Sequence, residues 1–356
     1  MTISEFLALV LLVGAIAGFV GAPARRASLW PLLPTLMLSL AAVRTSGVIQ
    51  AIILIVLLLM TALRVLRSTA IERQLRAWAI GSYVAGVIGF SIFIAADGEV
   101  ATLGAVVGCA VLLPLFPLHG GYLAAVAGLP PAAAAFTGIA LPILGLKTAA
   151  VLMPVLPEDW LPVIAVFAVF GTVYGSFRAL VQKSVVRLLA YGGFALITVI
   201  WWHLASLHAA TVAAFSYLGA LTLVIAGLRL AWQAVEHRYG NVAIGQLPGL
   251  ARTMPRFAFL FGLLVTAAMG LPPFGVFTGY VHMLLAPTPI VSAALFLVLF
   301  GWFAASWYWI TMLQGVLFGR HRTDVPYDDV RWTEAAAAIV IVVALLAIGA
   351  LPEASL

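Results

Sequence analysis

Three ionisable side chains stand inside long apolar stretches of this chain, where a charge is costly. Lys147 lies in "LPILGLKTAAVLM", His119 follows "LFPL", and His282 lies in "GYVHMLL". An amine or an imidazole can take up a proton and release it, so such residues at membrane depth predict a path for protons or another cation. Lys147 is the main candidate, with Pro142 upstream to kink its helix. The plainer alternative is that Lys147 extends its amine to the membrane surface, because "PEDW" follows soon after.

His119 stands at an interruption of an apolar run. The stretch from Leu112 to Pro131 runs "LLPLFPLHGGYLAAVAGLPP", and a second interruption, "GLPPFGVFTGYVHML", extends from Gly270 to Leu284. Proline removes a backbone N–H, and non-helical backbone at membrane depth is tolerated only where protein covers it or water reaches it. Paired interruptions are typical of inverted-repeat transporters. We therefore expect two broken helices, irregular near Pro114–Pro117 and near Gly270–Gly275, with both breaks buried in protein.

Composition defines the class of protein. Hydrophobic residues make up 64% of the 356 residues and charged residues 8%, against roughly 25% in a soluble domain. Apolar runs long enough to cross a bilayer recur along the whole length, which predicts an all-α polytopic membrane protein. The net charge of +6 arises in short loops between these runs, so it indicates topology and not nucleic-acid binding. Cys109 is the one cysteine, so no disulfide and no multi-cysteine metal site can form within the chain.

The elements that must position these residues are about twelve membrane spans, of which the fifth and tenth contain the interruptions. We place their starts near Ile3, Leu29, Ile49, Ala77, Ala101, Ala132, Leu161, Leu188, Ala210, Phe257, Ile290 and Ala335. No HExxH, Walker, GxGxxG or GxSxG motif accompanies them, so no cofactor, metal or independent catalytic site is expected. Trp201 and Trp202 are expected to anchor their span at the membrane interface.

Loop charges predict the orientation of the spans. Basic clusters, such as Arg64–Arg76 and Arg238–Arg256, follow odd-numbered spans, whereas Glu158 and Asp159 follow an even-numbered one. Arg44 is the exception. Basic loops remain in the cytoplasm, so we expect a multi-pass protein of the bacterial inner membrane with both termini outside. The first apolar run is expected to be a retained helix and not a signal peptide, because its positive charges follow it.

Several motifs resemble those of the antiporter-like membrane subunits of respiratory complex I, Mrp-type cation antiporters, membrane hydrogenases and inorganic-carbon transport complexes. "FPLHGGYLAAVAGLPP" is similar to the family's "PLHGWLPDAHxxAP", and "LVQKSVVRLLAYGGFAL" to "xxQxDxKRLLAYSSISxxG". "GLPPFGVFTGYV" resembles "GLPPxxGFxGE". The resemblance covers residues 91–356 and implies an antiporter-like core there, whereas residues 1–90 are N-terminal helices with a weak match. The whole, residues 1–356, is expected to be a single transmembrane domain.

The resemblance implies a proton path whose charges are reduced in this chain. The family's lysine on the first broken helix corresponds to Leu112, and its lysine on the next helix to Lys147, displaced by about one turn. Tyr280 takes the place of an acidic residue or lysine on the second broken helix, with His282 close by. The candidate path residues are thus Lys147, His119, His282 and Tyr280.

Three functions remain open. In the first, the chain conducts protons, or a cation such as Na+, as a subunit of a complex-I-like or related assembly, with energy supplied by a membrane or peripheral partner subunit. In the second, it is a scaffold subunit that has lost transport and only holds its partners in the lipid bilayer. The third, a quinone- or lipid-binding subunit, has no motif in its favour. The retained breaks, Lys147 and His119 favour conduction, and the missing charges favour the scaffold.

Overall fold

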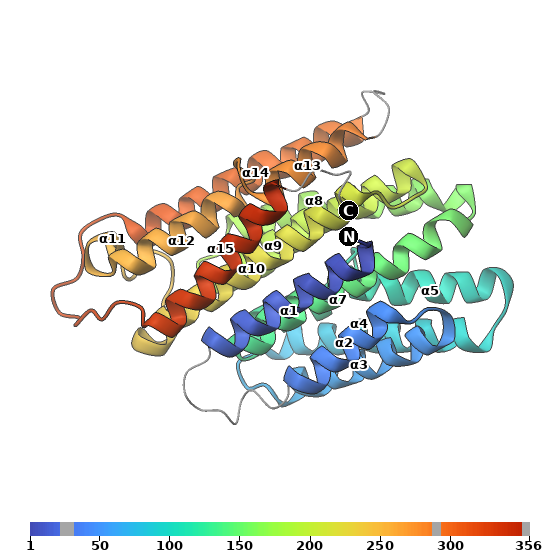
Figure 1. Ribbon diagram of the computed structural model, residues 1–356, viewed down its shortest axis with the longest axis horizontal. Coiled ribbons are helices and arrows are strands. Elements are labelled where there is room, and N and C mark those ends of the chain that lie inside the picture. Colours follow the sequence, from blue (N-terminus) through green and yellow to red (C-terminus); the bar gives the residue numbers. More distant parts are fainter. Residues whose placement is uncertain (22–31, 287–292, 351–356) are drawn as a thin grey trace.

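The computed structural model describes residues 1–21, 32–286 and 293–350, and these residues form an all-helical bundle (Figure 1). Within these ranges the only strand-like pairing is an isolated bridge between Ser184 and Ala243. The helices in chain order are α1 (Ile3–Gly21), α2 (Leu32–Arg44), α3 (Gly47–Arg67), α4 (Arg73–Ala95), α5 (Gly98–Leu112), α6 (Gly120–Gly128), α7 (Pro131–Leu152), α8 (Leu161–Leu180), α9 (Val185–Leu207), α10 (Val212–Tyr239), α11 (Leu250–Thr253), α12 (Pro255–Ala268), α13 (Gly275–Leu285), α14 (Ala293–Leu317) and α15 (Trp332–Ala350).

The predicted series of about twelve spans with two broken members is confirmed for the described part of the chain. Nine of the described helices are long and apolar enough to cross a membrane unaided. The other crossings are the shorter α2 and the two broken pairs, α5 with α6 and α12 with α13. The expected starts near Leu29 and Ile290 lie outside the described residues. The chain is therefore a polytopic membrane protein.

The order of helices repeats. Three continuous helices (α2, α3, α4), the broken pair α5/α6 and one continuous helix (α7) are followed by α8, α9, α10, the broken pair α12/α13 and α14. Because each set crosses the membrane an odd number of times, the second set begins on the side opposite to the first and is inverted relative to it. In Figure 1, α9 and α10 lie between α2–α4 and α12–α14, and both are almost wholly buried.

The first break, residues 113–119 between α5 and α6, lies where the prolines predicted it. Most of it is buried, although Pro117 is exposed. Its backbone is anchored by indoles from other helices: Trp201 Nε1 on α9 donates to the Leu113 carbonyl at 2.9 Å, and Trp78 Nε1 donates to the Pro117 carbonyl at 3.3 Å. Trp201 and Trp202 are both buried, so the prediction that they anchor at the interface is wrong. The released carbonyl of Leu113 needs a donor inside the protein, and this explains why Trp201 lies there.

The second break, residues 269–274 between α12 and α13, also lies where it was predicted. Trp302 Nε1 on α14 donates to the Met269 carbonyl at 3.0 Å. In each broken helix, therefore, the first carbonyl after the first half accepts a hydrogen bond from an indole of another helix. The expectation that this break is buried is wrong for Leu271, Pro272 and Pro273, which are exposed in the chain by itself. Irregular backbone at membrane depth does not face lipid, so this surface must be covered by another protein or reached by water.

Candidate functional site

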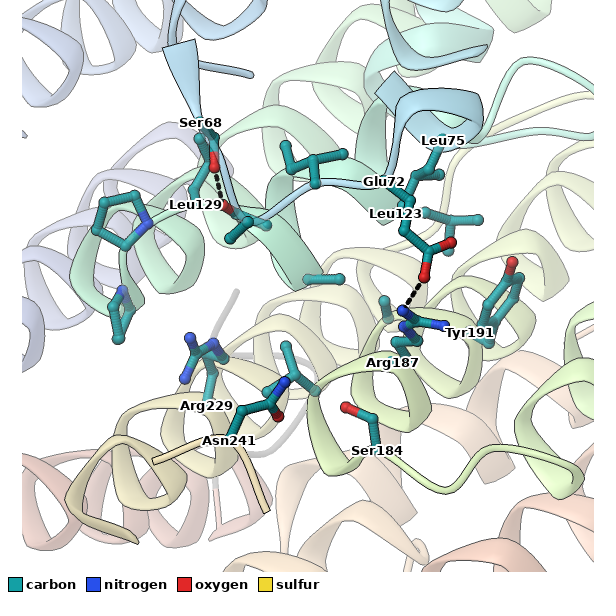
Figure 2. A pocket seen from close by; sticks show the side chains of 18 of the residues that line it. Ser68, Glu72, Leu75, Leu123, Leu129, Ser184, Arg187, Tyr191, Arg229 and Asn241 are labelled. Atoms are coloured by element: carbon teal, nitrogen blue, oxygen red, sulfur yellow. Dashed lines mark hydrogen bonds and ion pairs between the residues drawn. The ribbon is translucent and has the colours of Figure 1, made fainter. Parts of the chain in front are cut away.

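A cavity of about 930 Å³ opens at one end of the bundle, among the α3–α4, α6–α7 and α8–α9 connections and the last turns of α10 (Figure 2). We call it the basic pocket. Its charged lining residues are Arg64, Arg67, Glu72, Arg178, Arg187, Arg229 and Glu236. Five guanidinium groups thus face two carboxylates. A cavity of this size with a polar wall can hold water, and it gives water a route from this end into the bundle.

Ion pairs order the wall of the basic pocket. Arg187 pairs with Glu72, as the dashed line in Figure 2 shows, and Arg229 pairs with Glu236 at 2.8 Å. The Arg229 side chain is only 6% exposed, so it is a buried, paired cation. The guanidinium of Arg178 lies over the ring of Tyr191, 5.1 Å from its centroid. Both carboxylates are engaged, and the wall keeps a net positive charge.

His119 is the last residue of the first break, directly before α6, and is fully buried. Its ring stacks on Phe194 with centroids 3.9 Å apart and meets the edge of Trp78 at 4.5 Å. Tyr174 and Phe116 complete this aromatic cage. Neither ring nitrogen has a hydrogen-bond partner within the described ranges. Trp78 and Tyr174 also line the basic pocket, so one layer of rings separates the imidazole from the cavity.

Two glycines allow α6 to approach the cage. A Cβ on Gly120 would lie 2.8 Å from the Trp78 ring, and one on Gly121 would lie 2.9 Å from the Tyr83 ring. Both rings belong to α4, and Tyr83 donates its hydroxyl to the Gly121 carbonyl at 2.7 Å. The "HGG" sequence therefore brings the start of α6 against α4 and presses His119 onto Trp78.

Lys147 has a different environment. Its Nζ donates to the carbonyl of Ala42 at 2.8 Å and to that of Thr45, at the end of α2. A cation at a helix C-terminus satisfies free carbonyls and interacts favourably with the helix dipole. These groups share nothing with the cage of His119, so the structure does not place Lys147 and His119 in contact. Lys147 is half-buried and lies toward the end of α7 away from the basic pocket.

Tyr280 and His282 face opposite ways on α13. They are two residues apart, which turns them about 200° around the helix. Tyr280 is 1% exposed and donates its hydroxyl to the Val298 carbonyl at 3.2 Å. His282 is exposed in the chain by itself. Of the four predicted path residues, the structure thus buries His119 and Tyr280 and leaves Lys147 and His282 near the surface.

Further buried polar residues were not predicted. Tyr122, Tyr217, Tyr308 and His203 are each at most 4% exposed, although all stand in apolar runs. His203 Nε2 lies 2.8 Å from the Thr211 hydroxyl, at the far end of α9. No sequence signal separated these tyrosines from ordinary core aromatics. Within the described residues, no group of three or more histidine, cysteine or acidic side chains could hold a metal ion.

Comparison with known proteins defines the family. The family described as "NADH:quinone oxidoreductase/Mrp antiporter, TM" matches residues 97–320, and the chain belongs to it. NADH-quinone oxidoreductase subunit M of Pseudomonas aeruginosa is 26% identical over 261 residues, which are 70% of this chain and 50% of that protein. Subunit N of Parvibaculum lavamentivorans is 28% identical over 165 residues, 44% of this chain and 33% of that protein. The chain spans about half the length of the subunit M relative, and less of subunit N.

Solved structures share the fold. The chain aligns with respiratory complex I from Thermus thermophilus with bound NADH at a TM-score of 0.82 and 21% identity, covering 98% of this chain and 80% of that one. It aligns with the Mrp complex from Dietzia sp. DQ12-45-1b at a TM-score of 0.82 and 17% identity, with the same coverage. These likenesses establish the antiporter-like arrangement of helices.

Proposed function

We propose that the chain is a membrane subunit of a complex-I-like or related assembly and conducts protons, or a cation such as Na+, across the membrane while coupled to a partner subunit. The environment of His119 carries the proposal. Its imidazole is fully buried and has no hydrogen bond in the described structure. It stands at a broken helix, and one layer of aromatic rings separates it from the basic pocket. An imidazole can load and release a proton, and irregular backbone at membrane depth is tolerated where protein buries it or water reaches it.

The proposed path runs from the basic pocket through His119 to Tyr280 beside the second break. Lys147, which is half-buried, and His282, which is exposed, stand toward the other end of the bundle and belong to the outer part of the path in this proposal. We place the basic pocket in the cytoplasm and both termini outside, in the bacterial inner membrane, because its wall carries the basic loops. Residues 1–90 form the N-terminal part and residues 91–356 the antiporter-like core of a single transmembrane domain.

The partners supply the energy in this proposal. The relatives are subunits of quinone oxidoreductases, and the aligned structures include an Mrp complex, so other membrane or peripheral subunits are the expected neighbours. The exposed residues Leu271–Pro273 at the second break support a covering subunit. In this arrangement the chain has no catalytic reaction or cofactor of its own and acts at most as the translocating part of the assembly.

The scaffold function is the second candidate, and one observation favours it. The Lys147 amine caps α2, so the most suggestive residue of the sequence has a structural role that needs no proton. A chain that only holds its partners would retain this cap and both breaks. Transport measurements on the assembled complex separate the two candidates.

The test replaces His119 by phenylalanine. His119→Phe keeps a flat ring against Phe194 and removes both nitrogens. The chain is purified with its co-purifying subunits, placed in liposomes, and proton flux is followed with a pH-sensitive dye under an imposed gradient. We expect the variant to assemble and to lose flux by about tenfold or more, because proton transfer by a positioned side chain contributes at least that much.

Exposed His321 provides the control for this test. His321→Phe should leave proton flux unchanged. Normal flux in His119→Phe would exclude His119 from the path, and an intact wild-type assembly that moves neither protons nor Na+ would establish the scaffold function.

A further inference from the structure

Four buried tyrosines form a continuous series through the middle of the bundle. Tyr122 comes from α6, Tyr308 from α14, Tyr217 from α10 and Tyr280 from α13. Each is at most 4% exposed. We call this series the tyrosine ladder. Two of its members stand beside the breaks, because Tyr122 follows the first break within one turn of α6 and Tyr280 follows the second within two turns of α13.

The first three hydroxyls meet one stretch of α9. Tyr308 donates to the Gly192 carbonyl at 3.3 Å, and Tyr217 donates to the Leu196 carbonyl at 3.1 Å. The Tyr122 hydroxyl lies against Gly193, where an added Cβ would be only 2.5 Å from it. The adjacent glycines thus make room for two phenol groups from opposite sides of the bundle.

The fourth tyrosine connects the series to the second break. The Tyr280 ring lies 5.4 Å from that of Tyr217 and 4.5 Å from that of Trp302, between centroids. Trp302 is the indole that donates to Met269 at the second break. A Cβ on Gly279 would lie 2.7 Å from the backbone of Tyr217, so α13 and α10 are in backbone contact here.

The spacing along α9 suits water bridges. Gly192 and Leu196 are one turn apart, which is about 6 Å along the helix axis. Two hydrogen bonds through a single water span about 5.5 Å. The hydroxyls of Tyr308 and Tyr217 each donate to one of these carbonyls, and a hydroxyl that donates still has lone pairs with which to accept.

The Tyr122 hydroxyl gives an independent sign of a ligand. It is buried and has no hydrogen-bond partner among the described residues, whereas the other three hydroxyls of the ladder each donate to a carbonyl. Buried polar groups are normally satisfied by protein or by ordered water. Leu123, next to Tyr122 on α6, and Ala190, three residues before Gly193 on α9, line the basic pocket.

We propose that the tyrosine ladder carries protons across the middle of this chain, with Tyr122 as its first member after His119. The proposal rests on the proposed function and adds Tyr122, Tyr308 and Tyr217 to its path. In this proposal, uncharged hydroxyls and bridging waters carry the proton through the middle of the bundle, where the tyrosines stand in place of acidic or lysine side chains.

Each step conserves atoms and charge. A protonated water (hydronium) on the His119 side gives its extra proton to the Tyr122 oxygen, forms a new O–H bond there and is left as neutral water. The original O–H bond of the phenol breaks toward a water next to Tyr308, which becomes hydronium, so the phenol ends neutral and one positive charge has advanced. The same exchange repeats at Tyr308 and Tyr217, and rotation about each C–O bond restores the starting orientation.

A structural account of the ladder is that its hydroxyls only join helices, as interhelical hydrogen bonds do in membranes. Tyr122→Phe separates the accounts, because this hydroxyl makes no such bond in the described structure. In the assembled complex in liposomes we expect proton flux to fall by about tenfold or more. We expect assembly and melting temperature to be unchanged or improved.

Tyr83 is the matched control. It is 1% exposed and donates to the Gly121 carbonyl of the same broken helix, but it lies on α4, away from α9. Tyr83→Phe should lower the melting temperature and leave flux normal. Tyr308→Phe, a second variant of the ladder, should lose flux in the way that Tyr122→Phe does.

The outcomes are distinguishable. Normal flux in Tyr122→Phe and Tyr308→Phe, with a conducting wild type, overturns the ladder and leaves the proposed function standing. A wild-type assembly that moves Na+ but no protons overturns the ladder alone, and one that moves neither overturns both. Flux lost in the two ladder variants but kept in Tyr83→Phe supports the ladder.

Discussion

The position of Lys147 is consistent with two roles, a cap of α2 and a proton relay. Its amine donates to the last carbonyls of α2, which accounts for its position without any transport. It is also a titratable group within a span, next to Thr148, whose hydroxyl accepts from Gln50 at 3.3 Å. A cap requires only a positive charge, whereas a relay requires a group that can lose its proton. Substitutions can therefore distinguish these roles.

We expect both Lys147→Ala and Lys147→Arg to stop proton movement by the assembled complex. Arginine stays charged under all relevant conditions, so it can replace the cap but not the relay. Only the alanine variant should also lose stability, by about 1–2 kcal/mol in the free energy of unfolding, because the α2 carbonyls lose a charged donor. The measurements are dye-detected flux and thermal unfolding. If Lys147→Arg conducts normally, Lys147 is a cap and does not belong to the path.

The candidate path residues were predictable only where a sequence motif or an interruption indicated them. His119 and Tyr280 could be chosen because one stands at a proline–glycine interruption and the other at a motif position, and both are buried. Tyr122, Tyr217 and Tyr308 could not be chosen, because a tyrosine in an apolar run is usually a core side chain. What distinguishes them is that their hydroxyls reach α9, where Tyr217 and Tyr308 donate to backbone carbonyls, and this contact depends on tertiary packing.

At the scale of elements, the two broken helices share a device. Each first half ends on a carbonyl that the helix cannot satisfy, Leu113 after α5 and Met269 after α12, and each receives an indole N–H from another helix. The interruptions were predictable, because proline and glycine act locally. The positions of the indoles were not predictable, because Trp201 and Trp302 lie far in sequence from the carbonyls to which they donate. Nothing in the sequence of either segment indicates which carbonyl lacks a donor.

Trp201→Phe should therefore destabilise the chain more than Trp309→Phe. Both indoles are fully buried, but Trp309 Nε1 has no partner among the described residues, so its loss removes ring volume alone. Loss of the Trp201 donor also leaves the buried Leu113 carbonyl unsatisfied, at a cost of about 1–3 kcal/mol. Thermal unfolding of the two variants in the same detergent measures the difference. Equal melting temperatures would show that the indole does not support the break.

At the scale of the whole molecule, the sequence predicted the number and order of spans well because each apolar run is long and each loop is short. It did not predict which surfaces face other proteins. Leu271 is 43% exposed although it belongs to irregular backbone, and α12 places it about 20 Å from the basic end of the bundle, within the thickness of the hydrocarbon. The chain by itself leaves the residues of this break exposed, and at membrane depth a break must be covered by protein or reached by water.

A crosslinker at position 271 should therefore capture another subunit. Cys109 is the one native cysteine and is buried, so Leu271→Cys gives a unique reactive thiol for a photoactivatable benzophenone. In the assembled complex we expect illumination to produce an adduct with a neighbouring subunit, because that subunit covers the exposed backbone of the second break. The same variant purified without the other subunits should show no such adduct. Adducts with lipid alone in the intact assembly would contradict this interface.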